Sequence, residues 1–169
     1  TSELSGAGSK NIFLNKFDTD GNLLRTREFG TTKDDKGYSL AIDSSGNIYV
    51  VGVLGGRLTG NPTASAEGGG DILLAKYNTS GSQLWVKSFN GDFGSKWENA
   101  YGVDVDSSGN IYVTAASSGR YRSSTSSAGN TDILLIKFDS DGEETWVKQF
   151  GTWANDHGSG LEVDSSDNI

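Results

Sequence analysis

The stretch NIFLNKFDTDG at residues 11–21 returns twice along the chain, as DILLAKYNTSG at residues 71–81 and as DILLIKFDSDG at residues 132–142. The copies are offset by 60 and 61 residues. Self-similarity at a fixed period of this size is the signature of repeat architectures, in which each copy builds one supersecondary unit. We therefore expect one structural unit and its repetition to determine the whole fold.

A second stretch follows each copy of the first. IDSSGNIYV at residues 42–50 matches VDSSGNIYV at residues 105–113, and VDSSDNI at residues 163–169 matches its beginning. Apolar residues alternate with polar ones on both sides of the central turn, which is typical of half-buried strands joined in a hairpin. Each period thus predicts four short strands. Strands one and two flank the turn of this second stretch, and strands three and four flank the turn at the end of the first stretch.

Four antiparallel strands in every period are typical of a β-propeller blade, and closed propellers contain about 4–8 blades. We predict an all-β fold, a β-propeller segment built from four-stranded antiparallel blades, with two whole blades plus a split third. The expected divisions are residues 1–37 (strands three and four of the split blade), 38–100 and 101–159 (the whole blades with their following loops), and 160–169 (the first strands of an incomplete blade). Three blade equivalents are too few for a ring, so either the chain is a fragment of a longer one or separate copies complete each other's split blade.

The composition excludes several classes of protein. There is no Cys, which removes disulfides and thiol chemistry, and the formal charge of −8 argues against binding to a nucleic-acid backbone. No apolar run approaches the length of a membrane helix, so we expect no membrane insertion. The chain contains no Met and begins with Thr1, which predicts a processed or excised segment.

The repeated residues resemble a known family. The run DILLIKFDSDG followed by ETWVKQFG at residues 144–151, together with VDSSGNIYVT at residues 105–114, resembles the bacterial SBBP β-propeller repeat. The resemblance implies a blade fold and a place in large exported or surface-attached bacterial proteins, with no shared catalytic residue. The sequence departs from the pattern at Asp167, where Gly is expected, and at Leu24, where the other copies have Trp85 and Trp146.

Loop length indicates where a partner binds. The loops between strands two and three, and between strands four and one, are long, whereas the other turns are short, and alternate connections of a meander emerge on the same side. We expect ligand or partner binding on the long-loop side, because binding residues concentrate on loops. The candidate residues there are Arg57, Phe93, Trp97, Arg120, Tyr121, Arg122 and Trp153. Trp85 and Trp146, at matching strand positions, are expected to pack between blades.

Acidic residues offer a weaker candidate for a metal site. Asp-x-Asp-Gly occurs twice, and its oxygen donors suit calcium. The predicted calcium ligands are Asp18, Asp20, Asp139 and Asp141, although the middle copy forms the same turn as Asn78-Thr-Ser-Gly81 without either carboxylate. The acids that recur in every blade (Asp35, Glu98 and Asp156; Asp43, Asp106 and Asp164) are expected to support turns, with a cation-holding ring round a central channel as the alternative.

The sequence contains no spacing that pairs a nucleophile with a base, and its single histidine, His157, aligns with Lys36 and Asn99, a solvated position. We predict a non-catalytic scaffold, extracellular or at the cell surface of a bacterium, that binds a protein or glycan and needs no cofactor unless calcium binds. Two alternatives stay open. One is a structural unit of a filament or surface layer formed by self-association through blade completion, and the other is a propeller hydrolase or lyase with a channel cation.

Overall fold

The structure is a computed structural model that describes residues 8, 10–56, 70–91 and 97–169. Within these ranges every regular element is a β-strand, as the alternating pattern predicts. The strands are β1 (Ile12–Phe17), β2 (Leu23–Phe29), β3 (Lys36–Ile42), β4 (Ile48–Leu54), β5 (Asp71–Tyr77), β6 (Gln83–Phe89), β7 (Glu98–Val105), β8 (Ile111–Ser117), β9 (Asp132–Phe138) and β10 (Glu144–Phe150). None of the described residues forms a helix long and apolar enough to cross a membrane.

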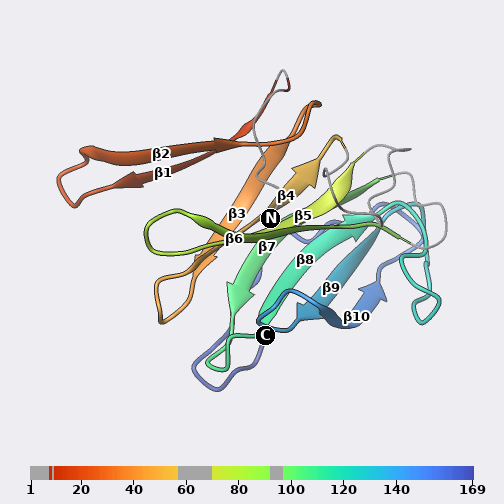
Figure 1. Cartoon of the computed structure of the whole chain (residues 1–169). Helices are drawn as coiled ribbons and strands as arrows, with labels where there is room; N and C mark the ends of the chain where they lie inside the picture. The colour runs from red at the N-terminus through yellow and green to blue at the C-terminus, as the bar shows by residue number, and fades with distance from the viewer. Residues whose placement is uncertain (1–7, 9, 57–69, 92–96) are drawn as a thin grey trace.

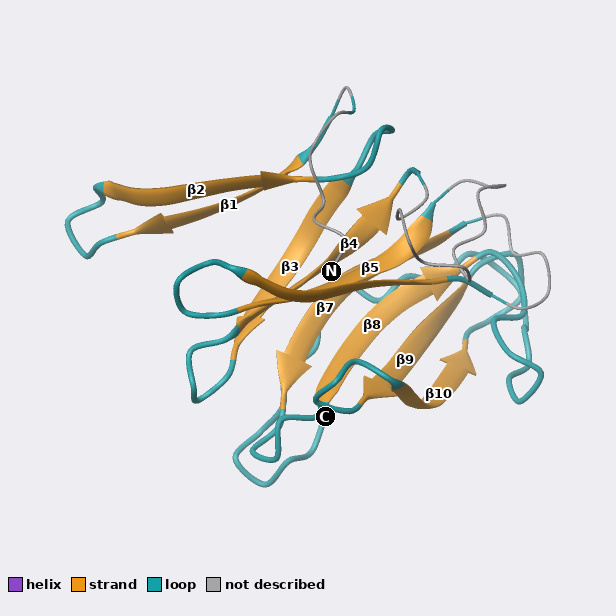
Figure 2. Ribbon diagram, viewed as in Figure 1, coloured by secondary structure: helices purple, strands orange, loops and turns teal. Residues whose placement is uncertain are grey.

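The strands form three separate antiparallel sheets (Figure 1). Two are four-stranded meanders, ordered β3-β4-β5-β6 and β7-β8-β9-β10, and the third contains only β1 and β2. The β1–β2 hairpin extends away from the other two sheets, and the sheets do not close into a ring (Figure 2). The predicted fold class is therefore confirmed: four-stranded antiparallel blades stand beside a two-stranded remnant.

The short hairpin turns repeat in atomic detail. Asp43 and Asp106 each accept hydrogen bonds through Oδ1 from two backbone N–H groups of their own turn, at 2.8–3.0 Å. Gly46 and Gly109 lie in the left-handed region, with φ of 80° and 82°, where a side chain is disfavoured. The recurrent acids and glycines therefore serve the turns, which is the structural role expected for them.

Two hydrophobic clusters join the three sheets. One face of the β3–β6 sheet, including Val51, Ile72 and Leu74, packs against Ile136 and Phe138 of the β7–β10 sheet. Its opposite face packs on the β1–β2 hairpin, in a cluster that includes Ile12, Phe29, Leu73 and Tyr77. Because both faces of this sheet are covered, β4 and β5 are almost continuously buried. The stacking of sheet upon sheet is the packing expected between neighbouring blades.

Trp85 packs between blades, as predicted. Its ring borders Gly142 in the turn of the next blade and lies edge-on to Tyr49 of its own blade, with the ring centroids 6.4 Å apart. Trp146 lies beside Tyr112 of its own blade, with the ring centroids 6.2 Å apart, and its packing between blades stays a prediction. The matching residue in the first copy is Arg25 and not Leu24, because Arg25 pairs with Lys16 as Trp85 pairs with Lys76 and Trp146 with Lys137.

The last ten residues form less structure than the repeat predicts. No strand is assigned over residues 160–169, although the turn forms, with the Asp164 N–H donating to the Asn168 carbonyl at 2.8 Å. Asp167 takes the place of the turn glycine at φ 60°. Its carboxylate accepts hydrogen bonds from the backbone and hydroxyl of Ser107, at 2.9 and 2.7 Å. The segment thus lies against the β7–β10 sheet without joining a sheet of its own.

Candidate functional site

The long loops gather at one end of the blades, which we call the long-loop end. Residues 118–131, between β8 and β9, lie opposite the short turns at 43–47 and 78–82 (Figure 1). Arg122 donates from Nη1 to the carbonyl of Asn90, at 2.6 Å, and so ties this loop to the end of β6. The backbone of Ser118 also donates to the carbonyl of Trp97, at 3.2 Å. Loops from both whole blades therefore build one surface.

The recurrent acids at the start of strand one hold this end together. Asp35 accepts hydrogen bonds from the Gly55 N–H at 3.0 Å and from the Thr31 hydroxyl at 3.0 Å. Asp156 accepts from the N–H and hydroxyl of Thr152, at 2.6 and 3.0 Å. A buried carboxylate that receives N–H donors is satisfied by the protein. In these two repeats the acid fixes the loop that precedes its strand.

Two of the predicted binding residues make structural contacts within the loop. Tyr121 is fully buried, so it presents no surface to a partner, and burial raises the pKa of its hydroxyl well above the usual range. Arg122 lies over the Tyr121 ring, 4.1 Å from its centroid, and reaches both carboxylate oxygens of Glu144, at 3.1 and 2.8 Å. A bidentate guanidinium–carboxylate pair beside an aromatic ring fixes the loop in place. The assignment of Tyr121 to a partner is therefore corrected here, whereas the assignment of the partly exposed Arg122 stays a prediction.

The other predicted residues differ in accessibility. Trp153 is 86 % exposed, which is extreme for the largest aromatic side chain. Arg120 is exposed, and its guanidinium bonds the carbonyls of Arg122 and Ser123 in its own loop. Trp97 is half-buried. Arg57 and Phe93 lie outside the described residues, so their part in the site stays a prediction.

An aromatic row crosses the long-loop end. The ring of Trp97 stacks on His157, with centroids 6.5 Å apart, and His157 meets Tyr101 edge-on at 6.3 Å. Tyr101 in turn lies 5.3 Å from Tyr38. We call Tyr38, Tyr101, His157 and Trp97 the aromatic row. It joins β3, β7 and the segment after β10, which are far apart in the sequence.

Sequence reasoning found only Trp97 among these four. A signal for two others was present, because Tyr38 and Tyr101 occupy the same position of strand one in successive copies. His157 gave no such signal, since the matching residues are Lys36 and Asn99. Within the described residues, no hydrogen bond or ring contact joins Trp153 to this row.

The Asp-x-Asp-Gly turns use their first carboxylate internally. Asp18 accepts through Oδ1 from the N–H groups of Asp20 and Asn22, at 3.0 and 2.8 Å, and the Asn22 amide donates to its other oxygen. These bonds, with that of the Asn22 side chain largest, lower the pKa of Asp18. Asp139 forms the same backbone bonds with Asp141 and Glu143. Calcium binding by Asp18, Asp20, Asp139 and Asp141 remains a prediction.

One buried acid, Asp71, has a raised pKa. Asp71 begins β5 at the long-loop end, and burial, with a smaller contribution from the nearby Glu98 carboxylate, raises its pKa to about 6. In the neighbouring copies this position is occupied by Asn11 and Asp132. Among the described residues, no three His, Cys, Asp or Glu side chains form a group that would hold a metal ion.

Comparison with known proteins supports the blade repeat. Residues 25–53, which run from β2 to β4, match the family model of the SBBP beta-propeller repeat. The chain is 30 % identical to the regulatory protein FlaEY of Caulobacter vibrioides over 170 aligned positions, which cover 94 % of this chain and 18 % of that protein. The chain therefore spans about a fifth of the length of this relative.

A solved structure shares the fold. A crystal structure of a protein of unknown function from Bacteroides caccae superimposes with a TM-score of 0.51 at 12 % identity. The match covers 90 % of this chain and 42 % of that one. At this identity the likeness concerns the fold alone.

Proposed function

We propose that the chain is a non-catalytic part of a larger bacterial β-propeller scaffold that binds a partner through its long-loop end. The observation that carries this proposal is the accessible aromatic surface there, since Trp153 is 86 % exposed and Trp97 is half-buried. Exposure of a large aromatic ring to water is unfavourable, so a partner that buries the ring gains binding free energy. The exposed Arg120 adds a charged donor to the same end.

A protein is the partner that these residues favour. Trp, Tyr and Arg are the residue types enriched at the energetic centres of protein interfaces. The described residues at this end include all three, on loops fixed by the Arg122–Glu144 pair. A glycan is the second candidate, because flat aromatic rings beside polar groups also suit the faces of sugars. The regulatory name of the Caulobacter relative favours a binding role over catalysis.

The proposed location is the cell surface or the extracellular medium. The match of residues 25–53 to the SBBP repeat supports it, because the resemblance implies exported or surface-attached proteins. Surface labelling of intact cells that produce the parent protein tests this part. Labelling only after lysis would contradict it.

The binding proposal is tested with two aromatic variants and one matched control. Trp153→Ala and the pair Trp97→Ala with Arg120→Ala each remove surface at the long-loop end. Leu84→Ala removes a 43 % exposed apolar side chain at the start of β6, beside the short turn at residues 78–82. The purified chain and its variants are passed over immobilised bacterial surface proteins and, in parallel, over a panel of immobilised polysaccharides.

We expect the long-loop variants to lose roughly tenfold or more in retention, the effect of truncating an interface anchor, with unchanged melting temperatures. Leu84→Ala should behave as the unmodified chain. Equal retention of all variants would contradict the assignment of the binding site to the long-loop end. The column that retains the unmodified chain decides between protein and glycan.

A further inference from the structure

One buried carboxylate at the long-loop end has an oxygen atom without a partner. Asp132 is the first residue of β9 and is fully buried. Its Oδ2 atom accepts hydrogen bonds from the Ala128 N–H and from the Gln149 side-chain amide, both at 3.0 Å. Its Oδ1 atom forms no hydrogen bond with any described residue. A buried charged oxygen without a partner is unfavourable, so its surroundings need a physical explanation.

A second carboxylate faces the same place. A Cβ atom on Gly151 would lie 2.5 Å from Asp132 Oδ1 and 3.0 Å from Asp156 Oδ2. Oxygen atoms of two acids therefore converge beside this glycine, which leaves open the space that a side chain would occupy. Gly151 is exposed and Asp156 is half-buried, so the place that the two oxygens face is open to solvent on one side.

No positive charge of the described chain compensates these two acids. Neither Asp132 nor Asp156 forms an ion pair with a Lys, Arg or His of the described residues. Gln149 and Thr152, whose side chains donate to them, are neutral. Charged groups inside proteins are paired with an opposite charge or coordinate a metal ion. The pair therefore has the charge and the free oxygen that a cation requires.

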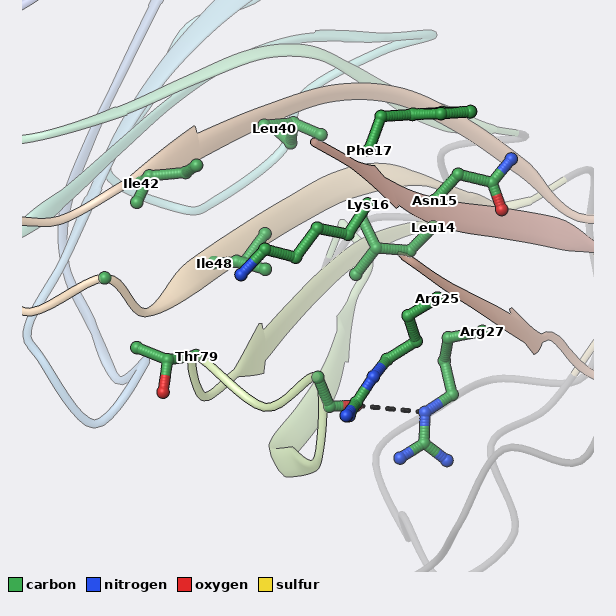
Figure 3. A pocket seen from close by; sticks show the side chains of 12 residues that line it. Leu14, Asn15, Lys16, Phe17, Arg25, Arg27, Leu40, Ile42, Ile48 and Thr79 are labelled. Atoms are coloured by element: carbon green, nitrogen blue, oxygen red, sulfur yellow. Dashed lines mark hydrogen bonds between the residues drawn. The ribbon is translucent and has the colours of Figure 1, made fainter. Parts of the chain in front are cut away.

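The apolar groove at the other end of the blades has the opposite chemistry. It lies between the β1–β2 hairpin and the β3–β6 sheet, and its volume is about 400 Å³ (Figure 3). Lys16, Arg25 and Arg27 line this groove, and none of the described residues around it is acidic. A free cation is therefore repelled from the groove and attracted to the acid pair at the long-loop end.

We propose that Asp132 and Asp156 bind a small divalent cation of the Mg²⁺ or Mn²⁺ type, with Asp132 Oδ1 as one of its ligands. Carboxylate oxygens and water are the ligands that these ions prefer. Calcium takes about 6–8 oxygen ligands, whereas Mg²⁺ is commonly held by one or two carboxylates and keeps several waters. The open side at Gly151 and Asp156 admits such waters.

The first copy of the repeat contains the same arrangement without the second charge. A Cβ atom on Gly30 would lie 2.5 Å from Asp35 Oδ2 and 2.9 Å from Asn11 Oδ1. Asn11 occupies the position of Asp132. Both oxygens of Asp35 accept backbone hydrogen bonds, from Thr31 and from Gly55. This place needs no cation, so the first copy shows how the fold accommodates an Asn–Asp pair.

The cation connects β9 to the loop that carries Trp153. The Thr152 N–H donates to Asp156 at 2.6 Å, and the Ala154 N–H donates to the Thr152 hydroxyl at 3.2 Å, so Trp153 lies inside the turn that Asp156 holds. Joining Asp156 to Asp132 fixes this turn further. One consequence rests on the proposed function: a loop fixed in advance loses less conformational entropy on binding, so the cation strengthens partner binding.

Titration with Mn²⁺ tests the site directly, because electron paramagnetic resonance measures the free ion. Asp132→Asn and Asp156→Asn each remove one carboxylate, and Asp132→Asn reproduces the Asn–Asp pair of the first copy. Each should bind Mn²⁺ at least about tenfold more weakly than the unmodified chain, as expected when a metal site is damaged. Glu162→Gln removes an exposed acid and should bind as the unmodified chain does. Equal affinities of all four proteins would overturn the proposal.

Thermal unfolding in EDTA and in Mg²⁺ separates a metal ligand from a merely structural acid. Mg²⁺ should raise the melting temperature of the unmodified chain but not that of Asp132→Asn, because an ion bound to the folded state stabilises it. In EDTA, Asp132→Asn should melt at the same temperature or higher, since it removes one of two facing charges. A variant that melts lower in EDTA and still responds to Mg²⁺ would contradict the site. Calcium binding as tight as that of Mn²⁺ would contradict the assignment to a small ion.

Trp153→Ala separates this proposal from the binding proposal. It should lose partner retention and keep the Mn²⁺ affinity of the unmodified chain. Asp132→Asn should lose Mn²⁺ affinity and, in retention, only the increase that Mg²⁺ produces. A chain that binds Mn²⁺ but retains no partner would contradict the proposed function alone. A chain that retains a partner but does not bind Mn²⁺ would contradict the cation site alone.

Discussion

At the scale of single residues, the recurrent carboxylates make the same turn hydrogen bonds in successive copies of the repeat. Asp106 accepts bonds from the Ser108 and Asn110 N–H groups through one oxygen and from the Asn110 amide and the Tyr112 hydroxyl through the other. Burial alone would raise its pKa, but these bonds lower it on balance. The same set recurs at Asp43, so the turn is built by one acid in each copy.

Asp71 provides a test at this scale. Its pKa of about 6 lies above the unfolded value of 3.8, because burial and Glu98 disfavour the charged form. An acid with a raised folded pKa favours the folded state at low pH, and this contribution is lost as pH rises from about 4 to about 6. Asp71→Asn should therefore be more stable than the unmodified chain at pH 7, by about 1–3 kcal/mol.

The measurement is urea unfolding of both proteins between pH 4 and pH 7. The stability difference should shrink toward pH 4, where Asp71 is protonated in the folded chain. Asp20→Asn, at an exposed turn position, serves as the control and should show no such trend. A difference that does not change with pH would contradict the assigned cause.

At the scale of strands and turns, residues at the same position of the repeat contribute differently to stability, because their neighbours in the fold differ. Trp85 and Trp146 hold the same place in strand four, and each lies beside a tyrosine of its own blade, Tyr49 and Tyr112. Trp85 in addition borders Gly142 of the next blade. The outcome depends on whether another blade stands beside the strand. A strand therefore has to be considered together with the sheet that it faces.

Trp85→Ala should destabilise the chain more than Trp146→Ala. Loss of a large aromatic side chain at an interface between sheets costs about 3–5 kcal/mol when the ring is fully buried, and somewhat less for the partly buried Trp85. Thermal unfolding of both variants compares the two positions. A Trp146→Ala variant that is equally or more destabilised would show that packing within a blade dominates.

The short turns allow a test of calcium. The carboxylate oxygens of Asp18 already accept N–H donors within the turn, as does one oxygen of Asp139. We therefore expect the melting temperature to be the same with added calcium and with EDTA. Asp20→Asn and Asp141→Asn are made in parallel. A rise in melting temperature with calcium that both substitutions abolish would instead support the metal site.

At the scale of the whole molecule, stability should be unevenly distributed. β4, β5 and β8 lie inside four-stranded sheets and are buried on both faces, whereas β1 and β2 form a two-stranded sheet with many exposed residues. Two-stranded sheets are marginal without further partners. The stability of the β1–β2 sheet therefore depends more on contacts with neighbouring segments than the stability of the four-stranded sheets does.

Hydrogen exchange checks this distribution. The amides of β1 and β2 should exchange roughly tenfold or more faster than those of β5 and β8, since local opening costs less there. Uniform protection of all strands in dilute solution would contradict the expected weakness of the hairpin.

The sequence by itself determined the strands, the turns and their repetition. Period-two alternation and Asp, Asn and Gly at turn positions act over a few residues, so they can be recognised without knowing the fold. The four-stranded meander and the inter-blade place of Trp85 followed from this local information. So did the structural role of Asp43 and Asp106, which repetition alone indicated.

Only the tertiary structure decided which side chains are accessible. Tyr121 and Arg122 have the composition of a binding loop, but Tyr121 is buried, and Arg122 is held by Glu144 and Asn90, which are 22 and 32 residues away from it. The aromatic row likewise joins His157 to Trp97 and Tyr101 across separate copies. Burial and long-range contact depend on how whole sheets stack, and no short stretch of sequence contains that information.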